Sequence, residues 1–265
     1  MATVRAKKSL GQHFLNDKAI AKQIVESLRA TSVNKVLEIG PGMGVLTQFL
    51  LQNKEYETSA VEIDRESVEY LNVHFPELKE RIISADFLQM RLDQHFTEPF
   101  AIIGNFPYNI STQIFFKVLE HRDQIPEVVG MLQKEVAERL ATGPGSKAYG
   151  ILSVFLQAYY NIEYLFTVDE DLFTPPPKVK GGVIRLTRNQ TQHLNCDEKL
   201  FKSVVKMAFN QRRKTMRNSL GGMIHNDELK ANPIFNKRPE QLGVEEFVMV
   251  VRMIGEQVKN SDQSQ

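Results

Sequence analysis

The segment Asn105–Ser111 combines groups that could bind and orient an aromatic amine. It places an amide, a proline and an exposed-type aromatic side chain directly after a short apolar run. Because Pro107 fixes its own φ and biases the preceding residue toward an extended backbone, nearby carbonyl oxygens stay outside a helix and can accept hydrogen bonds. The Asn105 oxygen and one such carbonyl could accept both N–H groups of a nucleobase amine, which would direct its lone pair at an electrophile. Tyr108 could stack on the base.

A simple turn between a strand and a helix is an equally good interpretation of this segment, since Asn, Pro and Ser are common turn residues. The preceding run Phe100–Gly104 is rich in Ile, which indicates a buried strand. Ser111 is then expected to cap the next helix. Open α/β sheets bind ligands outside the carboxyl ends of their strands, so the other strand ends have to decide between a turn and a site.

A glycine-rich turn follows a strand predicted at residues 36–39. Its sequence, Gly40-Pro41-Gly42-Met43-Gly44, lets a ligand approach the backbone and opens a helix whose N–H groups would face that ligand. The G-x-G-x-G spacing differs from the dinucleotide fingerprint, and Glu38 lies two residues before the first glycine. A carboxylate there would repel a pyrophosphate but suits a cofactor with a cationic amino-acid group. S-adenosylmethionine is such a cofactor, whereas a nicotinamide cofactor is disfavoured.

Acidic residues also end the next two predicted strands. Glu62 ends the strand at 59–63 and lies twenty-two positions after Gly40, where an acid commonly binds ribose hydroxyls. Asp86 follows the strand at 81–85, where it could accept from an adenine amino group beside Phe87. A single acid at a strand end is usually a turn residue or a cap. Three in register predict a nucleoside cofactor site.

The order of predicted elements indicates an α/β sheet of about seven strands followed by a smaller helical part. Further strands are expected at 127–133, 159–167 and 182–186, with helices at 134–140, 151–158, 197–210 and 245–258 and a helical segment through 220. The turn-rich loop Thr142–Gly150 could be a lid or a connector. We therefore predict a catalytic domain over residues 1–187 and a small helical domain over residues 188–265.

Phe173 precedes three consecutive prolines in a stiff segment between the last two predicted strands. In one interpretation this segment is a polyproline connector and Phe173 packs into the core. In the other, Phe173 is a second stacking face opposite Tyr108, because unpaired bases are held between aromatic rings.

Positive charge gathers in the C-terminal part, although the formal net charge is only +1. Between Arg188 and Gly222 eight Lys and Arg stand against two acids, and four of those cations fall in Phe209–Leu220 without an acid: Arg212, Arg213, Lys214 and Arg217. A charge run is usually a solvated face. The Asn, Gln and Ser residues among these cations favour contacts with RNA phosphates and sugar hydroxyls.

Bulk composition is that of an ordinary globular protein with 42% hydrophobic residues, enough for a large core. Cys196 is the single cysteine, which excludes an internal disulfide framework and suits the cytoplasm. No run approaches the ~18 apolar residues of a membrane helix, and the basic start of the chain lacks the apolar stretch of a signal peptide. No pair of histidines has a metal-ligand spacing, so no metal is expected.

Five segments together resemble the bacterial small-subunit ribosomal RNA adenine N6,N6-dimethyltransferases, over nearly the whole chain. The segments are Lys8–Leu15, Glu38–Gly44, Asn105–Ser111, Phe173–Val179 and Phe209–Thr215. Each motif alone is modest, whereas the set is very specific.

The resemblance implies a class I S-adenosylmethionine-dependent methyltransferase, with a Rossmann-like seven-stranded α/β sheet and a small C-terminal α-helical domain. The implied reaction is dimethylation of N6 on two adjacent adenosines near the 3′ end of 16S rRNA, in small-subunit biogenesis. The implied partner is 16S rRNA within a small-subunit assembly intermediate, with the protein acting as a cytoplasmic monomer.

Site residues follow from the same resemblance, position by position. Asn105 would orient the target amine, and Tyr108 and Phe173 would stack on the adenine. The cofactor would be bound by His13, Leu15, Gly40, Glu62, Asp86 and Asn105. The chain departs from the family pattern at His13, where many members have Asn, and at Phe106, where many have Leu. A backbone contact at the first position and a core-facing side chain at the second would tolerate both changes.

Two alternatives from different classes stay open. The related large-subunit rRNA adenine methyltransferase that confers macrolide resistance shares the cofactor and adenine motifs, and the segment Asn210–Ser219 argues against it. A ribosome-assembly binding factor with secondary methylase activity is compatible with an intact Asn105–Tyr108 motif.

Overall fold

The computed structural model describes residues 4–262, with the side chains of the last helix described up to residue 257. Contacts divide these residues into two compact units. Unit 1 comprises residues 4–138 and 160–189, and unit 2 comprises residues 139–159 and 190–262. Relative to the predicted division at residue 187, residues 139–159 group with the C-terminal helices. The division into a catalytic and a helical domain stays a prediction about function.

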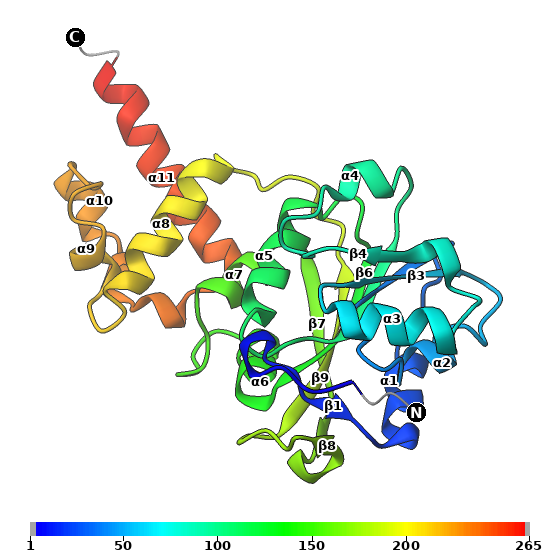
Figure 1. Cartoon of the computed structure of the whole chain (residues 1–265). Helices are drawn as coiled ribbons and strands as arrows, with labels where there is room; N and C mark the ends of the chain where they lie inside the picture. The colour runs from blue at the N-terminus through cyan, green and yellow to red at the C-terminus, as the bar shows by residue number, and fades with distance from the viewer. Residues whose placement is uncertain (1–3, 263–265) are drawn as a thin grey trace. The chain divides into compact units, whose positions relative to one another are not determined.

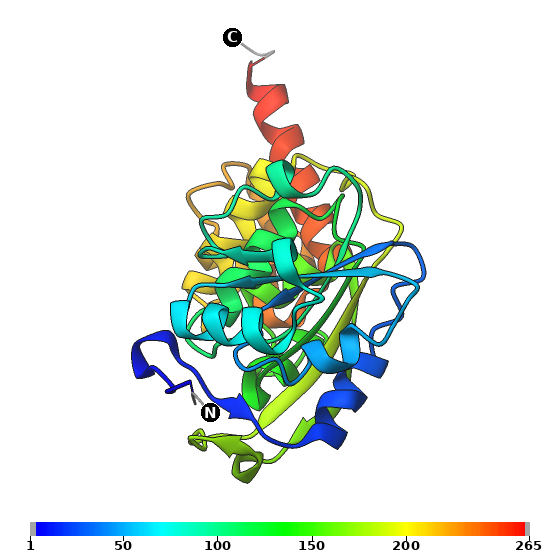
Figure 2. The same cartoon turned by 45° about the vertical axis from the view of Figure 1, so that its right-hand side comes forward.

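Unit 1 is built on a seven-stranded sheet of order β4-β3-β2-β5-β6-β9-β7 (Figures 1 and 2). The strands are β2 (Lys35–Ile39), β3 (Glu57–Glu62), β4 (Ile82–Ser84), β5 (Ala101–Asn105), β6 (Glu127–Gln133), β7 (Tyr160–Val168) and β9 (Gly181–Arg188). The first five are parallel, while β9 is antiparallel to both β6 and β7. The predicted α/β sheet of about seven strands is confirmed.

The central strands are buried on both faces. In β5 the four residues from Ala101 to Gly104 are all buried, and six consecutive residues of β6 are buried as well. Continuous burial of this kind requires helices on both sides of a sheet, which explains why these strands are unbroken apolar runs. The helices and 3-10 turns of unit 1 are α1 (Lys18–Glu26), α2 (Thr47–Leu50), α3 (Arg65–His74), α4 (Leu92–His95), α5 (Ser111–Glu120), η1 (Lys8–Leu10), η2 (Lys79–Arg81), η3 (Glu170–Leu172) and the start of α6 (Lys134–Ala141).

The strand order reverses at β2, which lies between β3 and β5. After β2 the chain builds β3 and β4 on one side, and then returns to place β5 on the other. The loops leaving β2 and β5 therefore separate at their carboxyl ends and leave a crevice, which is where this class of sheet binds ligands. The glycine-rich turn and the segment Asn105–Ser111 face each other across that crevice.

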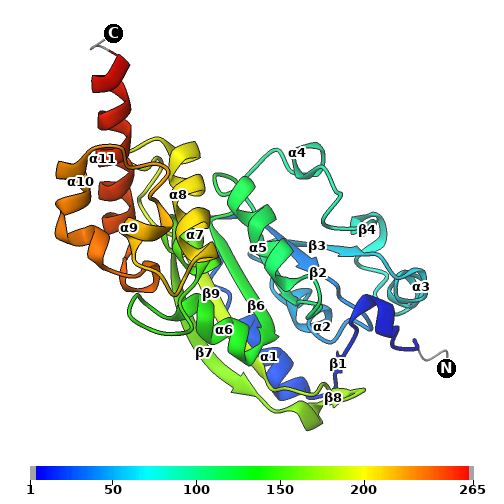
Figure 3. The same cartoon turned by 90° about the vertical axis from the view of Figure 1, so that its left-hand side faces the viewer.

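A short two-stranded ribbon joins the N-terminal arm to the segment before the prolines. Strand β1 (Phe14–Leu15) pairs antiparallel with β8 (Phe173–Thr174), so that Leu15 lies opposite Phe173 (Figure 3). The Asn16 amide donates to Thr174 Oγ1 at 2.7 Å, which reinforces the pairing. The arm is thereby held against unit 1 by a segment about 160 positions away in the sequence.

The structure identifies the cap of one helix and corrects the predicted cap of another. Asp17 rather than Asn16 caps α1, because its carboxylate accepts from Ile20 N at 2.9 Å while Asn16 is engaged in the ribbon. Ser111 is the first residue of α5 and does not cap it. Its hydroxyl instead donates to Tyr108 O at 3.4 Å, within the turn that leads into the helix.

Unit 2 is a cluster of helices with its own apolar core. Its members are the end of α6, α7 (Ile151–Gln157), α8 (Glu198–Asn210), α9 (Met216–Ser219), α10 (Asp227–Ala231), α11 (Val244–Asp262) and the 3-10 turns η4 (Pro233–Asn236) and η5 (Pro239–Gln241). Phe201, Phe209 and Phe247 are buried where α8 packs on α7 and α11. None of the helices in the described part of the chain has the length and apolar character needed to cross a membrane.

Candidate active site

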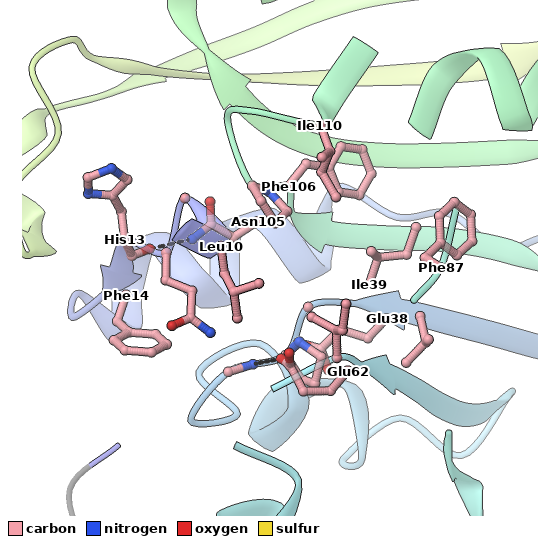
Figure 4. Close-up of a pocket in the computed structure, with 18 of the residues that line it drawn as sticks. Leu10, His13, Phe14, Glu38, Ile39, Glu62, Phe87, Asn105, Phe106 and Ile110 are labelled. Atoms are coloured by element: carbon pink, nitrogen blue, oxygen red, sulfur yellow. Dashed lines mark hydrogen bonds between the residues drawn. The ribbon is translucent and has the colours of Figure 1, made fainter. Parts of the chain in front are cut away.

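A cavity of about 280 Å³ lies at the carboxyl ends of β2, β3, β4 and β5 in unit 1 (Figure 4). The N-terminal arm, residues 7–15, supplies one wall of it through residues 9–15. Seven of the sequence-predicted site residues line this cavity: His13, Leu15, Gly40, Glu62, Asp86, Asn105 and Tyr108. The cavity thus brings together all six predicted cofactor-binding residues, and Asn105 and Tyr108 of the predicted catalytic residues.

The three glycines after β2 all have left-handed backbones, with φ of +65°, +56° and +78° at Gly40, Gly42 and Gly44. Only Gly40 leaves open space through which a ligand could approach the backbone, as predicted, because a Cβ at this position would meet nothing closer than Pro107 at 3.9 Å. A Cβ at Gly42 would lie 2.8 Å from the Phe14 ring, and one at Gly44 would lie 2.3 Å from the Phe75 ring. The second and third glycines therefore also make room for aromatic rings of the protein itself.

Glu62 holds the glycine-rich turn and the start of α3 together. Its Oε2 accepts from Gly42 N at 3.0 Å (Figure 4). Its Oε1 accepts from Asp64 N at 2.9 Å. Burial raises the pKa of this carboxyl, and the backbone donors oppose that shift. Each oxygen keeps a second lone pair, so the carboxylate can still accept from a pair of ligand hydroxyls.

Glu38 is fully buried at the end of β2, and its Oε2 accepts from the Thr47 hydroxyl at 2.6 Å. Burial, together with the negative charge of the neighbouring Glu62, raises the pKa of Glu38 to about 8, although hydrogen bonds from Thr47 oppose the shift. A cation in the cavity would favour the ionised carboxylate and lower this pKa. The pair of acids therefore suits a ligand with a positive charge and hydroxyl groups, as expected from the sequence.

Asp86 and Phe87 form the far end of the cavity, in the turn after β4. Asp86 Oδ1 accepts from Leu88 N at 2.8 Å, which leaves Oδ2 for an N–H donor of a ligand. Ile63 lines the same cavity and is 52% exposed, although it lies between the buried acids Glu62 and Asp64. Ile63, which was not among the predicted site residues, therefore presents an exposed apolar side chain to the cavity. Its signal was an apolar residue directly after the acid that ends β3.

Asn105 has a fixed orientation in the site. Its Nδ2 donates to the backbone oxygen of His13 at 2.9 Å (Figure 4). Because a carbonyl oxygen only accepts hydrogen bonds, the amide nitrogen must face His13 and the amide oxygen must face away from it. Among the described residues, none donates a hydrogen bond to Asn105 Oδ1. The side chain can therefore accept one hydrogen bond from a bound amine.

His13 contributes to the cavity through its backbone, while its ring has other contacts. Its Nδ1 donates to Pro175 O at 2.7 Å, and its ring centroid lies 5.6 Å from that of Tyr108. The Tyr108 hydroxyl is buried without a hydrogen-bond partner among the described residues, and burial raises its pKa to about 12. A buried hydroxyl without a partner destabilises the folded protein. A bound ligand could supply the missing partner.

Phe106 faces the core, as expected for its departure from the family pattern. Its ring meets Phe115 edge-on at 5.8 Å and lies over Gly104 and Gly130, where any Cβ would come within 3.0 Å of it. The absence of a Cβ at both glycines leaves the room that a phenylalanine ring, larger than a leucine side chain, needs at this position.

Phe173 is not brought to the cavity in this structure. Its side chain is 2% exposed and belongs to the core cluster that contains Leu15, its partner in the β1–β8 ribbon. A ring in that position cannot stack on a base opposite Tyr108 without leaving the core. The core interpretation of Phe173 therefore fits this conformation, and the stacking interpretation does not.

The four predicted RNA-binding cations lie in unit 2 and differ in their surroundings. Arg212 Nη2 donates to Lys147 O at 2.5 Å and to Ser146 O at 3.4 Å. Arg212 therefore stabilises the loop Thr142–Gly150 through hydrogen bonds to its backbone. This structural role is additional to the predicted contact with RNA. Arg213, Lys214 and Arg217 are exposed and make no recorded ion pair within the described residues.

No group of three or more His, Cys, Asp or Glu side chains in the described residues could hold a metal ion.

Comparisons with known proteins agree on one family. The family model described as ribosomal RNA adenine dimethylase matches residues 3–254. The ribosomal RNA small subunit methyltransferase A of Parabacteroides distasonis is 61% identical, over 94% of this chain and 93% of its own. The protein of the same name from Cytophaga hutchinsonii is 60% identical, over 96% of this chain and 99% of its own.

Solved structures share the fold over almost the whole chain. A dimethyladenosine transferase from Plasmodium falciparum has a TM-score of 0.78 at 22% identity, covering 92% of this chain and 98% of its own. The 23S rRNA methyltransferase ErmE has a TM-score of 0.67 at 26% identity, covering 90% and 99%. The predicted class I methyltransferase fold is confirmed.

The raised pKa of Glu38 predicts a pH dependence of stability. Between its reference value of 4.5 and about 8 the folded protein keeps a proton that the unfolded chain releases, so the free energy of unfolding should fall as pH rises through this window. Over the same range, the free energy of unfolding of Glu38→Gln should fall less than that of wild type. The difference between the two slopes should be at most about 1.4 kcal/mol per pH unit. Urea unfolding of the ligand-free proteins at pH 5.5 and 8 measures the difference, with the exposed Glu26→Gln as control. Parallel pH profiles for wild type and Glu38→Gln would contradict the assignment.

Proposed function

The chain belongs to the ribosomal RNA adenine dimethylase family, and on that premise we propose that it transfers methyl groups from S-adenosylmethionine to N6 of two adjacent adenosines near the 3′ end of 16S rRNA. The observation that carries this proposal is the oriented amide of Asn105, whose free oxygen is an acceptor at the rim of a nucleoside-sized cavity.

The residues around the cavity fit S-adenosylmethionine. Glu62 can accept from the ribose hydroxyls, and Asp86 Oδ2 can accept from the adenine amine between Ile63 and Phe87. Glu38 lies near the glycine turn, where the amino-acid group carries its positive charge, and this explains the match between two buried acids and a cationic ligand. When bound, the cofactor supplies a methyl group on a positively charged sulfur, which is the electrophile of the reaction.

The protein's part in the chemistry is to aim the target amine. An adenine amino group has its lone pair delocalised into the ring. Asn105 Oδ1 accepts from one of its N–H groups and a backbone carbonyl beside Pro107 accepts from the other, so that the lone pair becomes localised toward the electrophile. Tyr108 stacks on the target base. Catalysis then comes from positioning and from preorganised acceptors. The amine becomes acidic once methylated, so water can take the proton and no general base is required.

The small-subunit substrate is favoured over the large-subunit alternative. Both curated relatives near 60% identity are named small subunit methyltransferases, whereas the 23S methyltransferase ErmE is 26% identical. A role as a ribosome-assembly factor is compatible with the same site, and the protein could have this role in addition to methylating RNA. We further propose that the protein acts in the cytoplasm, as a monomer, on an assembly intermediate of the small subunit; the exposed cations of unit 2 support the RNA partner.

Asn105→Ala should abolish methylation while the protein stays folded. Removal of one preorganised group costs about 10²–10³-fold in rate, and the Asn105 side chain has a single recorded hydrogen bond to lose. The test incubates each protein with labelled S-adenosylmethionine and unmethylated small subunits and maps the modified bases. Wild type and the exposed α3 control Asn72→Ala should label two adjacent adenosines. Full activity of Asn105→Ala would refute the mechanism, and label at other bases would refute the substrate.

Tyr108→Ala and Phe173→Ala should fail in different ways. Loss of the Tyr108 ring should lower kcat/KM for RNA more than it weakens S-adenosylhomocysteine binding. Phe173→Ala should lower the free energy of unfolding by about 3–5 kcal/mol, as for other buried Phe residues, with activity following the folded fraction. Calorimetry, urea unfolding and steady-state kinetics separate the two effects. A stable Phe173→Ala protein with a selective loss of kcat would restore the stacking role.

Replacing Arg213, Lys214 and Arg217 by Ala should flatten the salt dependence of RNA binding. Each phosphate contact contributes about 0.7–0.9 to the slope of log K against log salt concentration, so the triple variant should lose up to about 2–3 in slope. Filter binding of a 16S rRNA fragment between 50 and 200 mM salt, concentrations at which such contacts are resolved, measures it. The exposed unit 1 cations Lys22, Lys54 and Arg65 provide a matched triple control. Equal slopes in both triples would mean that the cluster faces away from RNA.

A further inference from the structure

Lys117, in the second turn of α5, has an ammonium group buried against the turn that follows β4. Its Nζ donates to Phe87 O at 2.6 Å, to Leu88 O at 3.1 Å and to Met90 O at 2.5 Å. Nζ also lies 5.2 Å from the centroid of the Phe87 ring. A lysine has three N–H donors and no acceptor, so these three carbonyls use its full capacity.

The three carbonyls form a natural site for a cation. The turn Asp86–Met90 is a single helical turn, closed by the amides of Gln89 and Met90, which both donate to Asp86 O at 3.0 Å. Carbonyl groups that emerge from the end of such a turn carry partial negative charge. Among the described residues, Leu88 O and Met90 O have no backbone donor, and Phe87 O has only the Met90 amide at 3.3 Å. An ammonium satisfies them together. Burial lowers the pKa of Lys117, while Glu120 and Asp86 favour its charged form.

The position of this contact connects the two halves of the candidate active site. The turn carries Asp86 and Phe87, which line the cavity. Helix α5 begins at Ser111, directly after the segment that carries Asn105 and Tyr108. Lys117 is therefore the link between the backbone at the adenine end of the cofactor cavity and the helix that follows the target-base segment.

We propose that Lys117 is a positioning residue for methyl transfer: by holding the Asp86–Met90 turn against α5, it keeps Asp86 and Phe87 in the conformation that binds the adenosine end of the cofactor. This proposal rests on the proposed function, because it assumes that the cavity binds S-adenosylmethionine. It assigns to Lys117 no contact with cofactor or substrate. The competing explanation is a cross-link that contributes to stability alone.

Lys117→Met tests the proposal, because it keeps the length of the side chain and removes all three donors. The dissociation constant for S-adenosylhomocysteine, measured by calorimetry, should rise about ten- to a hundredfold, by analogy with the loss of hydrogen-bond partners that orient metal ligands. The KM for S-adenosylmethionine should rise by a similar factor while kcat changes little. Hydrogen exchange should accelerate at the amides of Gln89 and Met90 and stay slow in the central strands β2 and β5.

Controls separate this outcome from its alternatives. Lys22→Met removes an exposed lysine of α1 and should bind the ligand like wild type. Unchanged affinity and KM in a folded Lys117→Met protein would overturn the proposal, and so would faster exchange spread evenly over β2 and β5. If Lys117→Met does not fold, Lys117→Gln, which keeps an N–H donor group, decides in the same assays. Failure of wild type to bind S-adenosylhomocysteine would instead refute the cofactor assignment.

Discussion

The hydrogen bond from Asn105 Nδ2 to the backbone oxygen of His13 is the contact on which the rest of the site depends. It does two things at once, because its donor belongs to the target-base segment and its acceptor to the N-terminal arm. It turns the amide oxygen of Asn105 into the acceptor that an amine needs, and it holds the arm over the cofactor cavity. A site assembled in this way requires the arm to be correctly placed before the amide can be.

The arm is placed by contacts at both of its ends. Lys7 forms an ion pair with Asp64 and with Glu66 at the start of α3, and Gln12 donates to the same Asp64 at 3.2 Å. At the other end, β1 pairs with β8. Within β1, the Phe14 ring lies against Gly42. The glycine-rich turn therefore accommodates an aromatic ring of the arm at Gly42 and leaves open space at Gly40, which the G-x-G-x-G spacing alone does not reveal.

Local patterns predicted the strands and the acids at their ends, because both depend on residues that are adjacent in the chain. The strand at 127–133 has its predicted bounds, and the acids at 38, 62 and 86 line one cavity. Two other features depend on residues that are distant in the sequence. Which residue caps α1 depended on Asn16 being engaged by Thr174. The direction of the Phe173 ring likewise depended on the pairing of β8 with a strand from the other end of the chain. Neither is written in a local pattern.

The surroundings of the Lys and Arg side chains also depend on distant parts of the chain, because these parts supply the hydrogen-bond acceptors. Lys117 stands between Phe116 and Val118 on a largely apolar helix, where an ammonium would be costly without partners. Its partners come from a turn about 30 positions upstream. Arg212 similarly binds the carbonyls of a loop 65 positions away, whereas the adjacent Arg213 and Lys214 remain exposed. Adjacent basic residues thus differ in function. Arg212 holds the protein's own backbone, whereas the exposed Arg213 and Lys214 are available to bind a phosphate.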